Sequence, residues 1–328
     1  MHVVLSPYHL TTREPPAMAA LLLAETVTTL VPSARSGFGP AEFLAAARRS
    51  EKYARWVESW AWTLPLWNEG VLRSACEGVT PAGDVHDAFR VIEDDPEFDA
   101  LRPLLRPELF DDDALYLDAL AADLLKGGPD PGLSIPVAAG LDRFATRHGL
   151  AVVRACAASV AQHAEARFAE EIFSFAAPVL LQANGEHVLR ARRVLGPALA
   201  SLRDAVGGAA AAWGENARAA RATPAPVRDA AGAYAAAFDR ARAELCTCDK
   251  DEARVVDGLV AVSVTVLPTD AALRSGLAAV RSLAGGGVSS RPSPGSVLPV
   301  VRDPLAGGRF TALTVRAIGR PGVGAGRR

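Results

Sequence analysis

The two ends of the chain share one pattern, and that pattern is the strongest constraint on the fold. Near the start, a β-branched run at residues 3–5 leads through a polar stretch into an apolar segment at residues 16–24. Near the end, an alternating run at residues 260–267 leads through Pro268 into another apolar segment at residues 271–279. A short β-branched run, a proline stop and an apolar segment together predict a strand followed by a helix at each end.

The long middle of the chain shows almost no pattern typical of strands. Apolar residues at spacings of three and four predict helices over residues 41–76, 136–182, 186–206 and 225–245. Within the second of these stretches, residues 151–175 are predicted to form one helix with a single apolar face.

A strand at residues 2–6 would need neighbours, because a short isolated strand is not stable. The other predicted strands, at residues 259–267, 297–301 and 310–318, all lie near the end of the chain. We therefore predict a mainly α protein with a small β-sheet (α+β), in which a helical body is closed by a three- or four-stranded sheet formed from both termini. In this prediction the first strand pairs with residues 259–267.

The same pattern predicts the domain organisation. Residues 1–35 and 255–318 form the sheet region, residues 36–254 form the helical domain, and residues 319–328 form a disordered tail rich in glycine and arginine.

Composition excludes some functions. Half of the residues are hydrophobic, which is enough for a core, and the net charge of −2 gives no overall attraction to nucleic acid or to an anionic membrane. The apolar stretches are too short to span a bilayer, and no signal peptide is evident. Four scattered cysteines do not make a disulfide framework. We expect a cytoplasmic, bacterial-type protein without membrane contact.

Several catalytic motifs are missing. The chain has no G-x-x-x-x-G-K-[ST], no H-E-x-x-H and no G-x-S-x-G. Cys246 and Cys248 are followed by acidic residues, but no second pair of zinc ligands accompanies them. The sequence therefore predicts neither a cofactor nor a metal site.

The polar turn at residues 6–14 is the first candidate site. It follows the first strand and precedes a helix, a position where α/β sheets bind ligands. A histidine there could exchange protons near neutral pH, and an arginine could hold a carboxylate or phosphate. The alternative is simple helix capping with a solvated arginine. The candidate ligand-binding residues are Tyr8, His9, Thr12, Arg13 and Glu14.

The second candidate is a tryptophan stripe. Trp56, Trp60 and Trp67 recur at near-helical spacing, which is typical of an apolar pocket, a partner surface or ordinary helix packing. Our leading hypothesis for function is a non-catalytic helical protein that binds a protein partner through these residues or associates with itself. The first alternative is an enzyme or small-molecule binder that holds an anionic ligand at residues 6–14.

A second alternative involves the end of the chain. Seven arginines and one acidic residue follow residue 284, which could bind phosphates nonspecifically. No aromatic residues alternate with these arginines in the manner of a nucleic-acid-binding surface, so the sequence disfavours this alternative.

Overall fold

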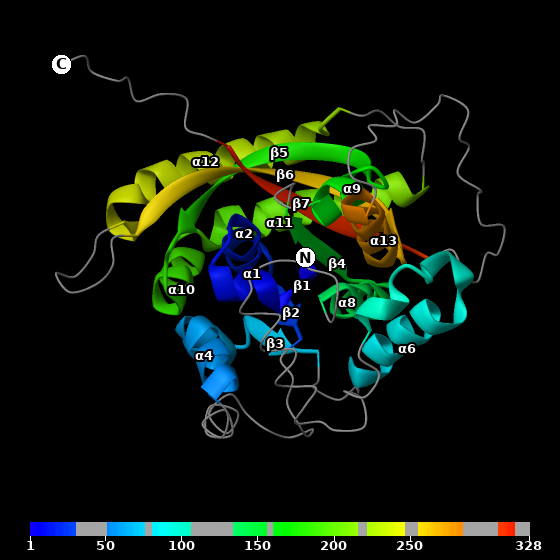
Figure 1. Ribbon diagram of the computed structural model, residues 1–328. Coiled ribbons are helices and arrows are strands. Elements are labelled where there is room, and N and C mark those ends of the chain that lie inside the picture. The colour runs from blue at the N-terminus through cyan, green and yellow to red at the C-terminus, as the bar shows by residue number, and fades with distance from the viewer. Residues whose placement is uncertain are drawn as a thin grey trace, which may run out of the picture.

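The computed structural model describes residues 1–30, 51–75, 81–105, 134–155, 160–215, 222–246, 255–284 and 308–318. These residues form a seven-stranded mixed sheet with helices packed on both faces, as Figure 1 shows. The strands are β1 (His2–Leu5), β2 (Thr26–Thr29), β3 (Leu72–Ser74), β4 (Ala151–Ala155), β5 (Glu170–Leu181), β6 (Val256–Pro268) and β7 (Arg309–Ile318).

The first helices of the chain are α1 (Pro7–Thr12), α2 (Pro15–Leu23), α4 (Glu51–Trp60), α5 (Leu64–Asn68) and α6 (Pro81–Asp94). The later helices are α8 (Ser134–His148), α9 (Val160–Ala166), α10 (Gly185–Val194), α11 (Gly196–Glu215), α12 (Ala225–Leu245) and α13 (Ala271–Ala284). Short 3-10 turns cover Ala61–Thr63, Pro96–Phe98 and Arg102–Leu104.

The strand order across the sheet is β3-β2-β1-β4-β7-β6-β5. Strands β3, β2, β1, β4 and β7 are mutually parallel, whereas β6 runs antiparallel to both of its neighbours. The order reverses at β1: the chain moves outward from β1 to β2 and β3, and then returns to place β4 on the other side of β1. This reversal makes the fold a doubly wound α/β sheet with an antiparallel part at one end.

The prediction of a mainly α fold with a small terminal sheet is wrong. Strands β3, β4 and β5 come from residues 36–254, which the sequence assigns to a helical domain, and β2 is a further strand within the N-terminal region. Strand β1 pairs with β2 and β4 rather than with β6. The helix predicted over residues 151–175 is in fact β4, α9 and the start of β5. A strand buried on both faces has a continuous apolar run without alternation, and a run of this kind cannot be told from a buried helix by its period.

Other elements are where the sequence predicts them. Strands β1, β6 and β7 and helices α12 and α13 match the predicted segments closely, and α8 forms the first part of the stretch that is predicted to be helical from residue 136. The predicted strand at residues 297–301 and the tail at residues 319–328 lie outside the described residues.

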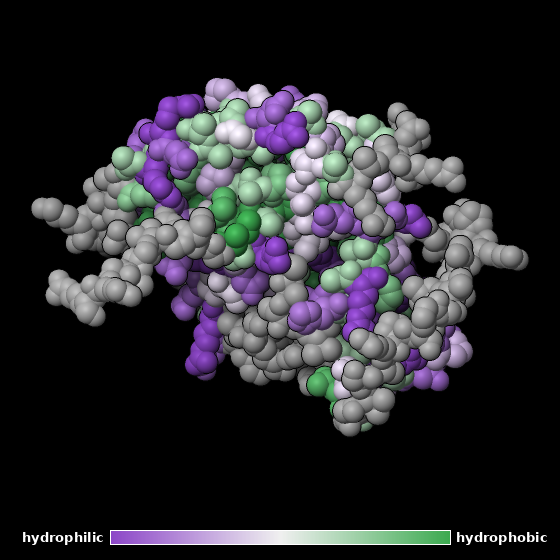
Figure 2. Space-filling model, turned by 90° about the horizontal axis from the view of Figure 1, so that it is seen from above, coloured by the Kyte–Doolittle hydropathy of each residue, from purple (hydrophilic) through white to green (hydrophobic). Residues whose placement is uncertain are grey.

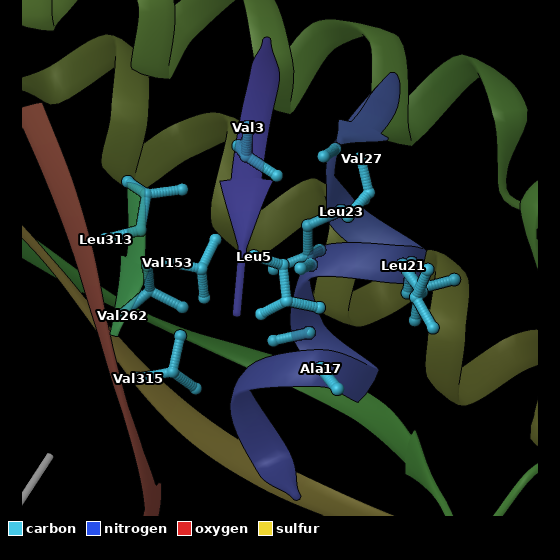
Figure 3. Close-up of a cluster of buried hydrophobic side chains, with 14 of the residues drawn as sticks. Val3, Leu5, Ala17, Leu21, Leu23, Val27, Val153, Val262, Leu313 and Val315 are labelled. Carbon is cyan, nitrogen blue, oxygen red and sulfur yellow. The ribbon is translucent and has the colours of Figure 1, made fainter. Parts of the chain in front are cut away.

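Helices cover the two faces of the sheet because its strands are apolar on both. Helix α2 packs against β1, β4, β5 and β7 on one face. Figure 3 shows Leu5 and Val153 close together on this face, next to α2. Successive side chains of a strand alternate in direction, so Val4 and Val152 point to the other face, where α8 packs against β1 and β4.

The long edge strand β5 is protected from pairing with another chain. The Thr223 hydroxyl donates to the Ser174 carbonyl at 2.5 Å, and the Tyr234 hydroxyl on α12 donates to the Pro178 carbonyl at 2.8 Å. Pro178 itself has no N–H to offer a neighbouring strand. Burial raises the pKa of Tyr234, which keeps this hydroxyl protonated as a donor. These contacts oppose self-association by strand addition at β5.

The C-terminal end of α2 is capped by two arginines from distant helices. Its last turn is buried, and the free carbonyls there need donors. Arg192 of α10 donates to the carbonyls of Leu21 at 2.7 Å and Ala24 at 2.6 Å, and Arg203 of α11 donates to those of Leu23 at 2.7 Å and Ala24 at 2.9 Å. Burial, aided by the charge of Arg203, lowers the pKa of Arg192 to about 10.

Helices α6 and α8 approach closely at Gly140. A Cβ atom at this position would lie 2.7 Å from Cγ2 and 3.0 Å from Cα of Val85. We expect Gly140→Ala to lower the free energy of unfolding by about 1–3 kcal/mol, because the backbone of α6 would have to move. Gly232→Ala on α12, where a Cβ would meet nothing within 4 Å, is the matched control. This control should raise stability by about 0.5–1 kcal/mol in urea denaturation. Equal effects of the two changes would contradict the packing argument.

Figure 2 shows an area of apolar surface in the middle of one face, bordered by hydrophilic residues. Among the described helices, none combines the length and the apolar character that crossing a membrane requires.

Candidate functional site

A small pocket lies at the carboxyl edge of the sheet between β1 and β4. In open α/β sheets, the point where strand order reverses leaves a crevice outside the carboxyl ends of the strands, because the adjoining connections leave in opposite directions. Here that point lies beyond Leu5 and Ala155, and the pocket found there has a volume of about 60 Å³. Most of its exposed lining surface is apolar, with contributions from Ile135, Ala138, Ala155 and Ala272. Its polar lining residues are Ser6, Tyr8, His9, Ser134, Arg154, Gln162, Glu165 and Ser275.

The local fold of the polar turn holds His9 against Glu14. Helix α1 runs from Pro7 to Thr12, and the residue that caps its C-terminal end, Arg13, adopts the left-handed conformation with φ of 50°. The Glu14 N–H then donates to the His9 carbonyl at 3.2 Å, and α2 begins at Pro15. This reversal brings the Glu14 carboxylate back over α1, where its Oε2 lies 2.6 Å from Nδ1 of His9.

The contact between His9 and Glu14 determines which nitrogen of the imidazole can react. His9 is 7% exposed and lines the pocket. With Nδ1 bonded to the Glu14 carboxylate, Nε2 is the nitrogen left to accept or donate a proton. A carboxylate that orients an imidazole in this way is the arrangement that general-base histidines use.

The hydrogen bond from His9 lowers the pKa of Glu14, against the opposing effect of partial burial. A carboxyl group with a lowered pKa stabilises the fold above its ordinary pKa, and this stabilisation is lost as the pH falls through the folded-state pKa. We therefore expect the loss of stability caused by Glu14→Gln to be largest at neutral pH and to shrink from about pH 5 to about pH 3.

Urea denaturation at a series of pH values measures this effect. Glu93→Gln, at an exposed position on α6, is the control and should differ little from the wild type throughout. A loss of stability in Glu14→Gln that stays constant with pH would show that the carboxylate contributes nothing through its charge.

The opposite wall of the pocket holds a buried ion cluster. Arg154 of β4 bonds to Asp142 of α8 and, through Nε, to Oε1 of Glu165 of α9 at 2.7 Å. All three side chains are buried or nearly so, and the Arg154 guanidinium also lies 5.7 Å from the centre of the Phe310 ring. Two carboxylates therefore neutralise the one cation in this wall.

Two serine hydroxyls in the pocket have no hydrogen-bond partner among the described residues. Ser6 Oγ follows β1 and Ser134 Oγ starts α8; the residues are 6% and 0% exposed. A buried hydroxyl without a hydrogen-bond partner lowers the stability of the fold. Such a group is therefore expected where it has a role in function, such as binding a ligand. Both hydroxyls belong to residues that line the pocket, so a ligand with donors and acceptors could satisfy them.

Of the remaining residues of the predicted turn, Tyr8 lines the pocket, whereas Thr12 and Arg13 do not. The Arg13 guanidinium lies 4.9 Å from the centre of the Trp62 ring, and partial burial lowers its pKa. The Thr12 hydroxyl donates to the Tyr8 carbonyl at 3.1 Å within α1. Tyr8 is buried and lines the pocket. Thus His9 and Tyr8 line the site, Glu14 supports it, and Arg13 does not reach it.

Of the predicted tryptophan stripe, the structure describes the side chains of Trp60 and Trp67, and both pack against the core. Trp60 is 3% exposed, and its ring centre lies 6.0 Å from that of Trp67. Trp67 packs against the core, and its Nε1 donates to the Thr63 hydroxyl at 3.1 Å. The side chain of Trp56 lies outside the described residues. Trp60 and Trp67 therefore have packing roles in the described structure.

Sequence reasoning missed Ser134, Arg154 and Glu165. Arg154 interrupts an apolar run, Ala151 to Val153, and a charged residue inside such a run can indicate a buried functional group. The predicted single helix over residues 151–175 gives no reason to place Arg154 beside the first strand. Only the sheet places β4 beside β1.

Among the described residues, no group of three or more His, Cys, Asp and Glu side chains is arranged to hold a metal ion. No protein-family model matches the chain, and neither a curated protein nor a solved structure matches it. The geometry of the pocket is therefore the basis for assigning a function.

Proposed function

We propose that this protein binds a small, uncharged polar molecule, or the polar end of a larger one, in the pocket between β1 and β4. In this proposal His9 exchanges a proton with the bound molecule. The observation that supports it best is the His9–Glu14 contact of 2.6 Å at the point where strand order reverses. Reversal points are where folds of this type most often hold ligands.

The charges of the pocket favour an uncharged ligand over the anion expected from the sequence. Arg13 is turned toward Trp62, and Arg154 already bonds to two carboxylates. No lining cation among the described residues is left to attract a phosphate or carboxylate strongly. By contrast, the hydroxyls of Ser6 and Ser134 can each both donate and accept, which suits alcohols, amides and nucleobases.

The geometry favours this function over the partner-binding hypothesis. Trp60 is buried in the core, and the exposed edge of β5 is protected by Thr223 and Tyr234. These observations reduce the surface available for the self-association that the sequence suggested.

The test is a ligand-observed NMR screen of small sugars, nucleosides and amides against the wild type, Ser6→Ala and Ser134→Ala. Each substitution removes a buried hydroxyl without a partner, so we expect the stability of the free protein to stay the same or rise by about 1 kcal/mol. Ligands found with the wild type should bind about tenfold more weakly to either variant. Such ligands should also shift the His9 ring resonances.

Ser201→Ala on α11 is the matched control, because this serine is exposed and distant from the pocket lining. It should change neither ligand binding nor the His9 resonances. Ligands that bind equally well to the wild type and to both pocket variants, or that leave His9 unperturbed, would refute the proposal.

A further inference from the structure

A second and larger cavity lies at the opposite edge of the sheet. It adjoins His2, Ala151 and Arg309, which are the first residues of the parallel strands β1, β4 and β7. The pocket around His9 lies beyond the carboxyl ends of the same sheet, so the two are separate sites. The volume of the second cavity is about 310 Å³, within the range of small-molecule sites.

The lining of this cavity has an apolar part that belongs to the core and a polar part that includes the side chains of Thr146 and Thr311. Val206 of α11, Val264 of β6, and Phe310 and Leu313 of β7 line it, and each is buried within the core cluster. Gly207 of α11 contributes no side chain, and a Cβ atom there would meet nothing within 4 Å. The space between α11 and the sheet therefore stays open over a surface that favours an apolar molecule.

The ionisable side chains that line the cavity are His2 and Arg309, of which Arg309 is a cation, and no described carboxylate belongs to the lining. Glu25 and Glu170 approach them from outside at 3.6 Å and 3.9 Å, distances longer than those of a good hydrogen bond. The Arg309 side chain is 68% exposed, so its guanidinium remains available to an anion at the mouth.

From these observations we propose that the cavity binds a small apolar molecule that carries one carboxylate. The apolar part lies against Val206, Val264 and Leu313, and the carboxylate lies at Arg309. A guanidinium binds a carboxylate through two parallel hydrogen bonds, which distinguishes this ligand from an alcohol or an amine of the same length.

Octanoate is the probe, with 1-octanol and octylammonium as uncharged and cationic comparisons in isothermal titration calorimetry. The wild type should bind octanoate about tenfold more tightly than octanol and should bind octylammonium most weakly. Ala210→Trp, which fills the cavity from α11, should abolish octanoate binding. Ala211→Trp is the matched control, because the neighbouring residue is exposed and does not line the cavity, and it should leave binding unchanged.

Arg309→Met tests the position of the carboxylate. This change should weaken octanoate binding about tenfold, to the level of octanol, whereas Arg316→Met at an exposed position on the same strand should have no effect. Failure of octanoate to bind the wild type would overturn the proposal. Equal binding by Ala210→Trp and the wild type, or equal affinity for the three probes, would also overturn it.

The Ser134→Ala variant separates this proposal from the proposed function. Ser134 belongs to the carboxyl-edge pocket, so this variant should bind octanoate as the wild type does. Loss of octanoate binding in Ser134→Ala would place octanoate in the pocket around His9 and would refute the proposal for the second cavity. Circular dichroism of each variant checks that the variant is folded.

Discussion

Replacing Arg154 with methionine is expected to lower the free energy of unfolding by about 3–5 kcal/mol. The change leaves the carboxylates of Asp142 and Glu165 buried without their cation. Breaking a buried ion pair costs far more than the pair itself contributes, because the remaining charge keeps its desolvation cost and loses its partner. Guanidinium chloride denaturation measures the loss.

Neutralising the two carboxylates should rescue this variant. The triple change Arg154→Met, Asp142→Asn and Glu165→Gln removes the uncompensated charges, and we expect it to recover more than half of the lost stability. Arg316→Met is the control, since this arginine of β7 is exposed, and its effect should stay within about 0.5 kcal/mol. A loss below about 1 kcal/mol for Arg154→Met would show that solvent reaches the cluster.

Replacing both Arg192 and Arg203 with methionine is expected to lower the free energy of unfolding by about 5–6 kcal/mol. Each single change should cost about 2 kcal/mol, because buried carbonyls at the end of α2 lose a charged donor. The two arginines share the Ala24 carbonyl, at 2.6 Å and 2.9 Å, and also donate to other carbonyls of the same turn. Each can therefore partly compensate for loss of the other, so the double change should exceed the sum of the single changes.

Thermal and urea denaturation of the two single variants and the double variant form the required cycle. Arg193→Met is the matched control, because Arg193 follows Arg192 on α10 and is exposed. It should change stability by less than about 0.5 kcal/mol. Strict additivity in the cycle would contradict the idea that the two guanidinium groups act as one cap.

The observed fold gives residues 6–14 different neighbours from those that the sequence predicts. Under the predicted small sheet, residues 6–14 would lie at the edge of a helical body and would face strand β6. In the structure they lie beside β4, and the partners of β1 are β2 and β4. The turn therefore faces α8, α9 and α13, which supply Ser134, Glu165 and Ser275 to the pocket.

Local patterns were enough to find some elements and not others. Alternation of valines with small residues predicted β6, and the spacing of apolar residues predicted α12, because each of these elements has one buried and one more exposed side. Strand β4 has no such asymmetry, since Val152 and Val153 are both buried. Strand β2 is not among the predicted strands, although its Thr-Val-Thr-Thr sequence is typical of strands.

The chain by itself determined that Ser6 to Glu14 follows a strand and precedes a helix, and that His9 and Glu14 are close enough in sequence to meet. These are properties of a few consecutive residues, and local conformation is sufficient to produce them. Only the tertiary structure decided which groups face His9, because Ser134, Arg154 and Glu165 are brought there by the pairing of β1 with β4. That pairing joins residues about 150 positions apart through hydrogen bonds between backbone N–H and C=O groups. Because every residue other than proline carries these same groups, the local sequence does not show which strands will pair.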